Sequence, residues 1–292
     1  NLGGPDSLEA VRPFLFNLFS DPDIFRLPLG WFTQRPFASL VARRRTPSAT
    51  EGYAAIGGKS PILDNTRAQA KALKRELKDH EGTDVHVCMR YWHPLTSEVV
   101  AELKEKNYAR ILLLPLYPQY SITTTGSSYN EFQRQCERQH YRPVVTLIRQ
   151  WYDQPDYLGA IVETLLAEGR KFPDPDPERI ELLISAHGLP RKIVDGGDPY
   201  ERQIRATYEA LREQLGWPHT TLCYQSRVGP LEWLRPYIQD VIRDKAATGV
   251  KQMLVYPIAF VSDHVETLYE LGITYAALAP RLELSEASVK RM

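Results

Sequence analysis

The strongest constraint on this chain is the regular alternation of short, nearly continuous apolar runs with longer segments of helical periodicity. The predicted strands are Val85–Met89, Ile111–Leu116, Val144–Ile148, Glu181–Ser185, Thr221–Tyr224 and Met253–Ile258. Unbroken apolar strands are typical of parallel sheets that are covered on both faces. The predicted helices are Asn65–Leu77, Leu95–Lys106, Ser127–Arg138, Pro155–Arg170, Pro199–Leu215, Leu231–Lys245 and Val265–Leu278. This alternation predicts an α/β fold with parallel sheets flanked by helices.

The length of the chain and one internal break indicate two halves. At roughly 150 residues per domain, a chain of 292 residues suits two domains. A stretch rich in Pro and Asp, Phe172–Pro177, has the composition of a linker or exposed loop. The residues around Cys88 and those around Cys223 are weakly alike. We therefore predict two similar α/β halves, residues 1–150 and 151–292.

Composition and charge argue against several classes of protein. The 36 Lys and Arg residues balance 36 Asp and Glu residues, so the chain lacks the excess of cations on which nucleic-acid binders rely. Its apolar runs are far shorter than the ~18 residues that span a bilayer. The cysteines, Cys88, Cys136 and Cys223, are isolated in sequence, which favours a reducing compartment such as the cytoplasm. The opening segment Asn1–Pro5 has no signal-peptide pattern, and we expect that a structural element precedes it.

The segment Phe14–Arg45, in the first half, differs from the rest of the chain. Aromatic residues and prolines crowd it, and it ends on three consecutive arginines, Arg43, Arg44 and Arg45. Two interpretations stay open. The segment is either a helical excursion folded onto the core, or an apolar lip, rimmed by cations, that admits a flat hydrophobic ligand or touches lipid.

Titratable side chains follow two predicted strands of the second half. They are His187, after one strand, and Asp263, His264, Glu266 and Glu270, after another. Ligands of open α/β sheets bind beyond the carboxyl ends of the strands, so we expect these side chains to form a site. Imidazole with carboxylate suits a divalent metal such as ferrous iron. Glu266 and Glu270 share a helical face, which suggests either a carboxylate ladder that passes a cation inward or an ordinary solvated face.

Several common motifs are absent. Gly57–Ser60 resembles the end of a phosphate-binding P-loop, but the first glycine of that motif would fall at Tyr53. No GxGxxG follows a strand, no GxSxG surrounds Ser185, and there is no HExxH. These absences argue against nucleotide cofactors and serine hydrolysis. The run Thr123–Ser128 precedes a helix, which its hydroxyl groups either cap or equip to hold a carboxylate.

A series of short motifs runs in a fixed order along nearly the whole chain. They are Asn1–Pro5, Arg44–Pro47, Tyr53 with Ile56–Pro61, Met89–Pro94, Tyr117–Ser121 with Thr124–Ser128, Ser185–Pro190, Gln225–Pro230 with Trp233, and Phe260–Leu271. Together they resemble the motifs of ferrochelatases, lyases that insert ferrous iron into a porphyrin at the end of haem biosynthesis. The resemblance implies two Rossmann-like halves of the chelatase type, with the porphyrin in a cleft between them.

The resemblance also implies roles for individual residues. His187 matches the family's central histidine, proposed to take pyrrole protons or to ligate the metal, and Glu266 matches its acidic partner. Asp263, His264 and Glu270 complete the expected metal-ligating set. The expected porphyrin-binding positions are Leu2, Leu18, Ile24, Pro190, Val228 and Trp233, on the pocket wall, and Arg45, Tyr53, Ser60 and Arg90, which meet propionates or line the pocket.

Departures from the family pattern predict that no cofactor is needed beyond the iron substrate. Some ferrochelatases hold a [2Fe–2S] cluster on three C-terminal cysteines and one internal cysteine. Here Ile122 occupies the internal position and no cysteine follows Cys223. Thr274 stands where some relatives have a further carboxylate, which would leave a carboxylate ladder one member short. The sequence also begins after the family's usual first strand and ends before its usual final helix, so we expect an open sheet edge if no further residues complete the sheet.

The expected activity is insertion of ferrous iron into protoporphyrin IX by a monomer or homodimer, either in the cytoplasm or peripherally on the inner membrane. Coproporphyrin is the alternative substrate, although Leu2 and the aromatic segment favour the less charged ring. A haem or metal carrier is the alternative from another class. It needs no base and no acidic relay, so the presence of His187 and Glu266 disfavours it. A chelatase for another metal or tetrapyrrole fits the Arg45 and Trp233 motifs poorly.

Overall fold

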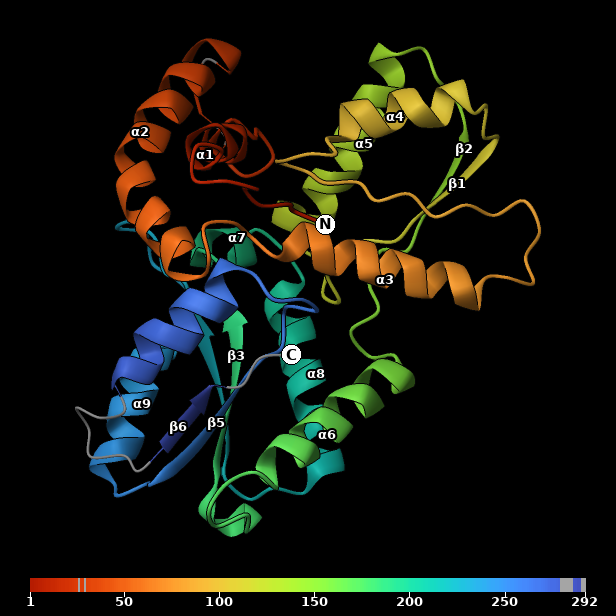
Figure 1. Cartoon of the computed structure of the whole chain (residues 1–292). Helices are drawn as coiled ribbons and strands as arrows, with labels where there is room; N and C mark the ends of the chain where they lie inside the picture. Colours follow the sequence, from red (N-terminus) through yellow and green to blue (C-terminus); the bar gives the residue numbers. More distant parts are fainter. Residues whose placement is uncertain (26, 29, 279–285, 290–292) are drawn as a thin grey trace. The chain divides into compact units, whose positions relative to one another are not determined.

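A computed structural model describes residues 1–25, 27, 28, 30–278 and 286–289 (Figure 1). The described chain forms two compact units. Unit 1 comprises Asn1–Tyr117, Ser121–Arg149 and Ser262–Val265, and unit 2 comprises Pro118–Tyr120, Gln150–Val261 and the described residues from Glu266 onward. A short piece of unit 1 therefore interrupts unit 2 immediately before Glu266.

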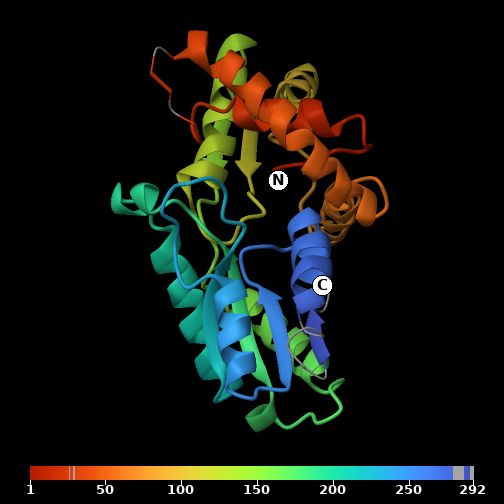
Figure 2. The ribbon, with the colours of Figure 1, turned by 90° about the vertical axis from the view of Figure 1, so that its left-hand side faces the viewer.

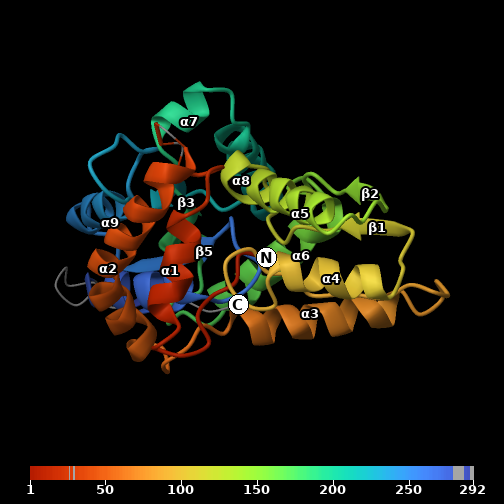
Figure 3. The same ribbon diagram turned by 90° about the horizontal axis from the view of Figure 1, so that it is seen from above.

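Unit 1 combines helices with a small parallel sheet. Its helices are α1 (Val11–Phe19), α2 (Trp31–Ala55), α3 (Ile62–Glu76), α4 (Thr96–Glu105) and α5 (Ser127–Arg138), and a π-helix over Ile122–Gly126 leads into α5. The strands β1 (Arg110–Leu113) and β2 (Val144–Leu147) pair in parallel. Helices α1 and α2 lie alongside each other in both Figures 1 and 3.

The small sheet of unit 1 is covered on one face only. Side chains alternate between the two faces of a strand, and those of Ile111, Leu113 and Val145 pack with α4 and α5. On the other face Leu112 is 62% exposed and Val144 is 66% exposed. The prediction that both strands are covered on both faces is therefore wrong for β1 and β2, although their parallel pairing is confirmed.

The strand predicted over Val85–Met89 is not formed. The structure has only a single bridge there, between Met89 and Leu95. The backbone next to this bridge bonds to the start of the chain, and the N–H of Arg90 donates to the carbonyl of Asn1 at 2.9 Å. A β-ladder needs several consecutive residues on both strands, and this pairing is too short to make one.

Unit 2 is a parallel sheet with helices on both faces. Its strands are β3 (Glu181–His187), β4 (Thr220–Gln225), β5 (Gln252–Pro257) and β6 (Glu286–Val289), all parallel, in the order β4-β3-β5-β6. Its helices are α6 (Pro155–Gly169), α7 (Arg191–Asp195), α8 (Tyr200–Leu215) and α9 (Ile238–Ala247), a π-helix over Glu266–Tyr275, and short 3₁₀ turns at Pro177–Arg179 and Ala276–Leu278. Figure 2 shows α9 on the viewer's side of this sheet.

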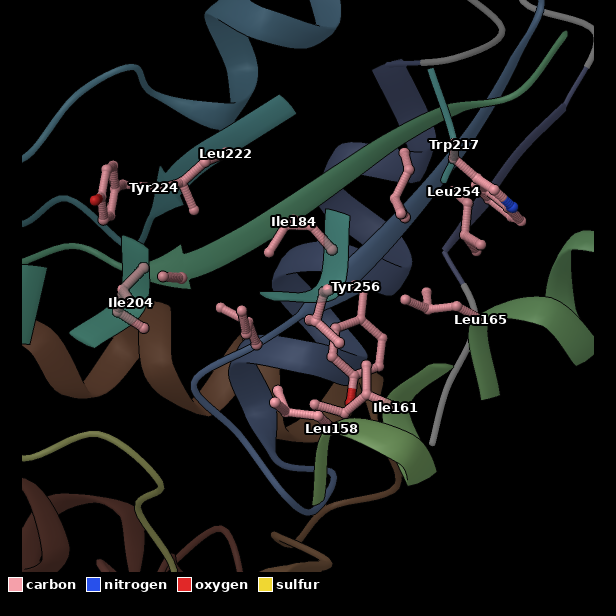
Figure 4. Close-up of a cluster of buried hydrophobic side chains, with 14 of the residues drawn as sticks. Leu158, Ile161, Leu165, Ile184, Ile204, Trp217, Leu222, Tyr224, Leu254 and Tyr256 are labelled. Carbon is pink, nitrogen blue, oxygen red and sulfur yellow. The ribbon is translucent and has the colours of Figure 1, made fainter. Parts of the chain in front are cut away.

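The apolar strands of unit 2 build two cores, one on each face of the sheet. Ile184 of β3 and Tyr256 of β5 join the core beneath α6 and α8, and Figure 4 shows Tyr256 against Leu158 and Ile161 of α6. The alternate residues, such as Leu183, face the second core with α9 and the π-helix. Each fully buried Leu or Ile contributes about 1.5–3 kcal/mol. Two such cores fix β3 in place, and the prediction of doubly covered strands is confirmed here.

Two helices of unit 2 differ from their predictions. The helix expected from Leu231 begins only at Ile238. Pro236 disfavours helical geometry in the residue before it, and Leu234 donates its N–H instead to the carbonyl of Leu189, two residues beyond the end of β3. The helix predicted over Val265–Leu278 exists, but most of it is a π-helix.

The aromatic segment Phe14–Arg45 largely follows the first of its two interpretations. Phe14 and Phe19 are buried in one cluster with Tyr53. An exposed remainder lies on α2, where Phe32 is 68% exposed and Leu40 is 50% exposed, followed by the exposed Arg43, Arg44 and Arg45. Among the described helices, none combines the length and the apolar character needed to cross a membrane.

Candidate active site

His187 is the last residue of β3, the strand that lies between β4 and β5. Its Nδ1 lies 2.6 Å from the carbonyl oxygen of Gly188. A carbonyl oxygen only accepts, so Nδ1 carries a proton and donates it, and in the neutral ring Nε2 keeps its lone pair. Tyr200 donates its hydroxyl to the carbonyl of His187 at 2.9 Å. These contacts fix both the backbone and the ring, and they present Nε2 as a base.

Glu266 begins the π-helix and faces this base. Its Oε2 lies 3.8 Å from Nε2 of His187, which is longer than a hydrogen bond but close enough for strong attraction when the ring is protonated. Both side chains are about one-third exposed, so a substrate can reach them. An imidazole and a carboxylate thus meet at the end of β3, where the sequence analysis expects these two residues to lie together.

Ser226 makes hydrogen bonds to both carboxylates of the π-helix, Glu266 and Glu270. It directly follows β4, and its backbone has φ +63°. Its N–H donates to Glu270 Oε1 at 3.0 Å, and its Oγ lies 2.5 Å from Glu270 Oε2 and 3.2 Å from Glu266 Oε2. The sequence prediction did not include Ser226, although its position directly after a strand was a usable signal.

Glu270 is an acid whose environment disfavours its charge. Burial raises the pKa of Glu270 above its usual value, and the neighbouring negative charge of Glu266 adds to this, while hydrogen bonds from Ser226 and Tyr275 oppose it. Tyr275 donates its hydroxyl to Glu270 Oε1 at 2.7 Å. Burial, followed by the Glu270 charge, holds the pKa of Tyr275 well above its usual value, so its phenol stays a donor.

The other predicted metal ligands, Asp263 and His264, belong to unit 1. The backbone carbonyl of Asp263 accepts a hydrogen bond from Asn65 Nδ2 at 3.4 Å, and His264 Nδ1 lies 3.3 Å from the carbonyl of Ser262. The predicted set is thus divided, and the three members in unit 2 are His187, Glu266 and Glu270. Among the residues that the structure describes, no three His, Cys, Asp or Glu side chains form a cluster arranged to hold a metal ion.

In unit 2 the predicted pocket residues Pro190, Val228 and Trp233 lie together beside His187. Pro190 and Trp233 form a β-bridge, and the indole N–H of Trp233 donates to the carbonyl of Val228 at 3.0 Å. The centroid of the indole lies 6.1 Å from that of the His187 ring. Trp233 is buried, whereas Val228 is 39% exposed. The structure therefore places an apolar wall next to the base.

In unit 1 the predicted pocket-wall residues share one cluster with Tyr53. Tyr53 is buried there, and Leu2, Leu18 and Ile24 are partly buried around it. Their side chains are therefore largely committed to the core of unit 1, with the partly exposed edges of the three aliphatic residues as the available contact surface.

The predicted polar residues of unit 1 are more scattered. Ser60 packs so tightly on Gly4 that a Cβ at Gly4 would lie 2.6 Å from the Ser60 hydroxyl oxygen, so no larger residue fits at position 4. Arg45 is exposed on α2.

Arg90 has a carboxylate partner inside unit 1 that the sequence prediction missed. Its guanidinium lies 3.0 Å from Oδ2 of Asp21, which is fully buried, and its Nε donates to Ser127 Oγ at 2.8 Å. Tyr91 donates its hydroxyl to the same Asp21 oxygen at 2.6 Å, and Ser127 does so as well. Asp21 thus supplies an internal carboxylate at the start of α5, where a helix favours negative charge. No local pattern in the sequence signals this distant pairing.

Comparison with known proteins identifies the family that the chain resembles. The sequence model of the ferrochelatase family matches residues 1–291. Ferrochelatases of Trichormus variabilis, Nostoc sp. and Synechocystis sp. are 47%, 46% and 46% identical to the chain, over 96% of its length and 72%, 72% and 73% of theirs.

A solved structure shares the fold. SirB from Bacillus subtilis with Fe3+ superposes with a TM-score of 0.51 at 13% sequence identity, over 76% of this chain and 79% of SirB. This similarity confirms the predicted α/β chelatase-type fold and speaks to the fold alone. The match to the family over nearly every residue, and the identity to three ferrochelatases, confirm the resemblance drawn from the motifs. The chain belongs to the ferrochelatase family of metal-chelating enzymes.

Proposed function

We propose that this chain inserts ferrous iron into protoporphyrin IX to form protohaem, with release of two pyrrole protons. The observation that carries the proposal is the pairing of His187 with Glu266 at the end of a strand that is buried on both faces. Metallation replaces two N–H bonds of the ring with bonds from nitrogen to iron, so it needs a base and a route for protons. A carrier that only binds haem needs neither.

His187 suits the role of the base. Its Nδ1–H is held by the Gly188 carbonyl, so Nε2 is the atom that accepts a pyrrole proton. The carboxylate of Glu266, 3.8 Å away, stabilises the imidazolium that results. Glu266 and Glu270, joined through Ser226, supply oxygen ligands to the incoming cation and acceptors for the departing protons.

The porphyrin contacts follow from chemistry. Trp233 and Val228 offer an apolar wall beside the base, and an exposed Arg45 can pair with a propionate. Because Arg90 already neutralises the buried Asp21, it is one cation fewer for propionates. This supports protoporphyrin IX, with two propionates, over coproporphyrin, with four.

The experiment that tests this function is anaerobic incubation of the chain with ferrous iron and protoporphyrin IX, followed by absorbance and by loss of porphyrin fluorescence. We expect multiple turnovers of haem, and slower turnover when coproporphyrin replaces protoporphyrin. Binding of porphyrin without turnover would favour a carrier. Faster turnover of coproporphyrin would reverse the substrate assignment.

We also propose that the exposed face of α2, with Phe32 and Leu40 next to basic residues, contacts the surface of the inner membrane from the cytoplasmic side. Flotation with anionic liposomes tests this, and Phe32→Glu should reduce the floating fraction. Protein that stays wholly in the soluble fraction would contradict the proposal. In line with Ile122 at the internal cysteine position, the purified chain should contain no acid-labile sulfide.

A further inference from the structure

Glu270, the second carboxylate of the π-helix, has a further hydrogen-bond partner, Tyr275, that the sequence analysis did not identify. Glu270 accepts three hydrogen bonds, from the N–H and the hydroxyl of Ser226 and from the hydroxyl of Tyr275. Tyr275 in turn accepts a hydrogen bond from Gln239 Nε2 of α9 at 3.1 Å. Because the amide already donates to the phenol oxygen, the phenol hydrogen is directed to Glu270.

The π-helix is what brings Tyr275 to this carboxylate. In an α-helix of 3.6 residues per turn, residues five apart are rotated by about 140° around the axis. A π-helix closes its hydrogen bonds from i to i+5, so its turn is wider and residues 270 and 275 come to one face. Tyr275 is 4% exposed and packs with Leu271 and Val241. Its neighbour Thr274, where a further carboxylate would stand, is exposed.

We propose that Tyr275, held by Gln239, is a positioning residue for capture of the iron substrate, because it fixes the carboxylate of Glu270. This inference rests on the proposed function. Tyr275 acts through Glu270 and has no direct contact with iron or porphyrin. Carboxylates that bind metals are usually oriented by a hydrogen-bonded partner, and loss of such a partner typically lowers metal affinity about 10- to 100-fold. In this chain the group that follows the carboxylates Glu266 and Glu270 is therefore a neutral hydrogen-bond donor, the phenol of Tyr275.

The test measures the KM for each of the two substrates, ferrous iron and protoporphyrin IX, in turn. Tyr275→Phe keeps the ring and removes the hydroxyl, and anaerobic steady-state kinetics are measured with ferrous iron varied and with protoporphyrin IX varied. We expect the KM for ferrous iron to rise about tenfold, while kcat and the KM for protoporphyrin IX stay within about twofold of the unmodified chain. Gln239→Met should raise the same KM by a smaller factor, because the phenol remains.

The matched control is Tyr208→Phe, which removes a phenol that donates to the carbonyl of Thr220 at the other end of β4 and should leave all three constants unchanged. The inference is overturned if Tyr275→Phe leaves the KM for iron unchanged, or if the loss falls on kcat or on the KM for porphyrin. An unmodified chain that gives no turnover overturns the proposed function and this inference with it. Turnover in the unmodified chain with no effect of Tyr275→Phe overturns this inference alone.

Discussion

Each unit contains a cluster of charged side chains, and the two clusters differ in how fully their groups are satisfied. In unit 1 the buried Asp21 takes hydrogen bonds from Tyr91 and Ser127 and an ion pair from Arg90. In unit 2 the His187 ring and Glu266 stand 3.8 Å apart and are partly exposed. A saturated cluster of buried charges specifies structure. A partly open pair retains the capacity to take a proton or a cation, and this is what catalysis needs.

The largest expected effect is on turnover, and its absence would contradict the contrast between the two clusters. His187→Ala should lower kcat by about 10²- to 10⁴-fold, the usual cost of losing a general base, while folding and porphyrin binding persist. Anaerobic haem formation measures the first, and quenching of porphyrin fluorescence measures the second. His219→Ala, an exposed histidine of the same unit that pairs with Glu178, is the control and should keep full activity. Wild-type turnover in His187→Ala would remove the base assignment.

Disruption of the charged cluster of unit 1 should lower the free energy of unfolding. Asp21→Asn leaves Arg90 without its buried counter-charge, and breaking such a pair typically costs about 3–5 kcal/mol. The free energy of unfolding in urea measures this. Asp64→Asn breaks the exposed pair with Lys59 and should change the free energy of unfolding little, because solvent screens the pair. Equal costs for the two variants would mean that burial of the Asp21 network has no energetic consequence.

A smaller effect is expected where a charge of unit 1 meets the substrate. Arg45 is exposed, so its pairing with a propionate is worth about 1 kcal/mol, and Arg45→Ala should raise the KM for protoporphyrin IX about fivefold. The effect should weaken at high salt. Arg44→Ala removes an adjacent exposed charge and serves as the control. If both variants raise the KM equally, the role belongs to the basic surface and not to Arg45.

The smallest expected effect is on how stability depends on pH, and it concerns Glu270 in the cluster of unit 2. The pKa of Glu270 is raised in the folded chain, so the folded state holds this proton more tightly than the unfolded state does. The resulting stabilisation is complete below the ordinary value of 4.5 and is lost as pH rises through the folded pKa. Urea midpoints from acidic to neutral pH should therefore fall less in Glu270→Gln than in the unmodified chain. Parallel curves would contradict the raised pKa.

Sequence reasoning succeeded where structure follows from local pattern. The strands β3 and β5 of unit 2 are buried on both faces and therefore read as nearly unbroken apolar runs. The rule that sites form at the carboxyl ends of parallel strands then places His187 at the end of β3 and Glu266 after β5. It failed where the outcome depends on a distant partner, as at Val85–Met89, whose neighbour on the sheet is set by the rest of the fold.

The same division explains the residues that were missed. Asp21 lies 69 residues from Arg90 in sequence (90 minus 21), and nothing near either residue marks the pair. Tyr275 was missed for a geometric reason, since a five-residue spacing from Glu270 points away in the α-helix that was expected. Ser226 was within reach, because it lies two residues after the predicted strand Thr221–Tyr224 and within the motif Gln225–Pro230.

The order β4-β3-β5-β6 has a consequence for how firmly His187, the proposed base, is held in place. The backbone of β3 is bonded to neighbours on both sides, and its residues up to Ala186 are buried. Interior strands of this kind exchange their amide hydrogens only in the rare openings that unfold the whole domain. Deuterium uptake in β3 should therefore be among the slowest in unit 2, together with that of β5, which also has a neighbour on each side. His187, one residue beyond the protected stretch of β3, is anchored on one of the slowest-opening parts of the unit.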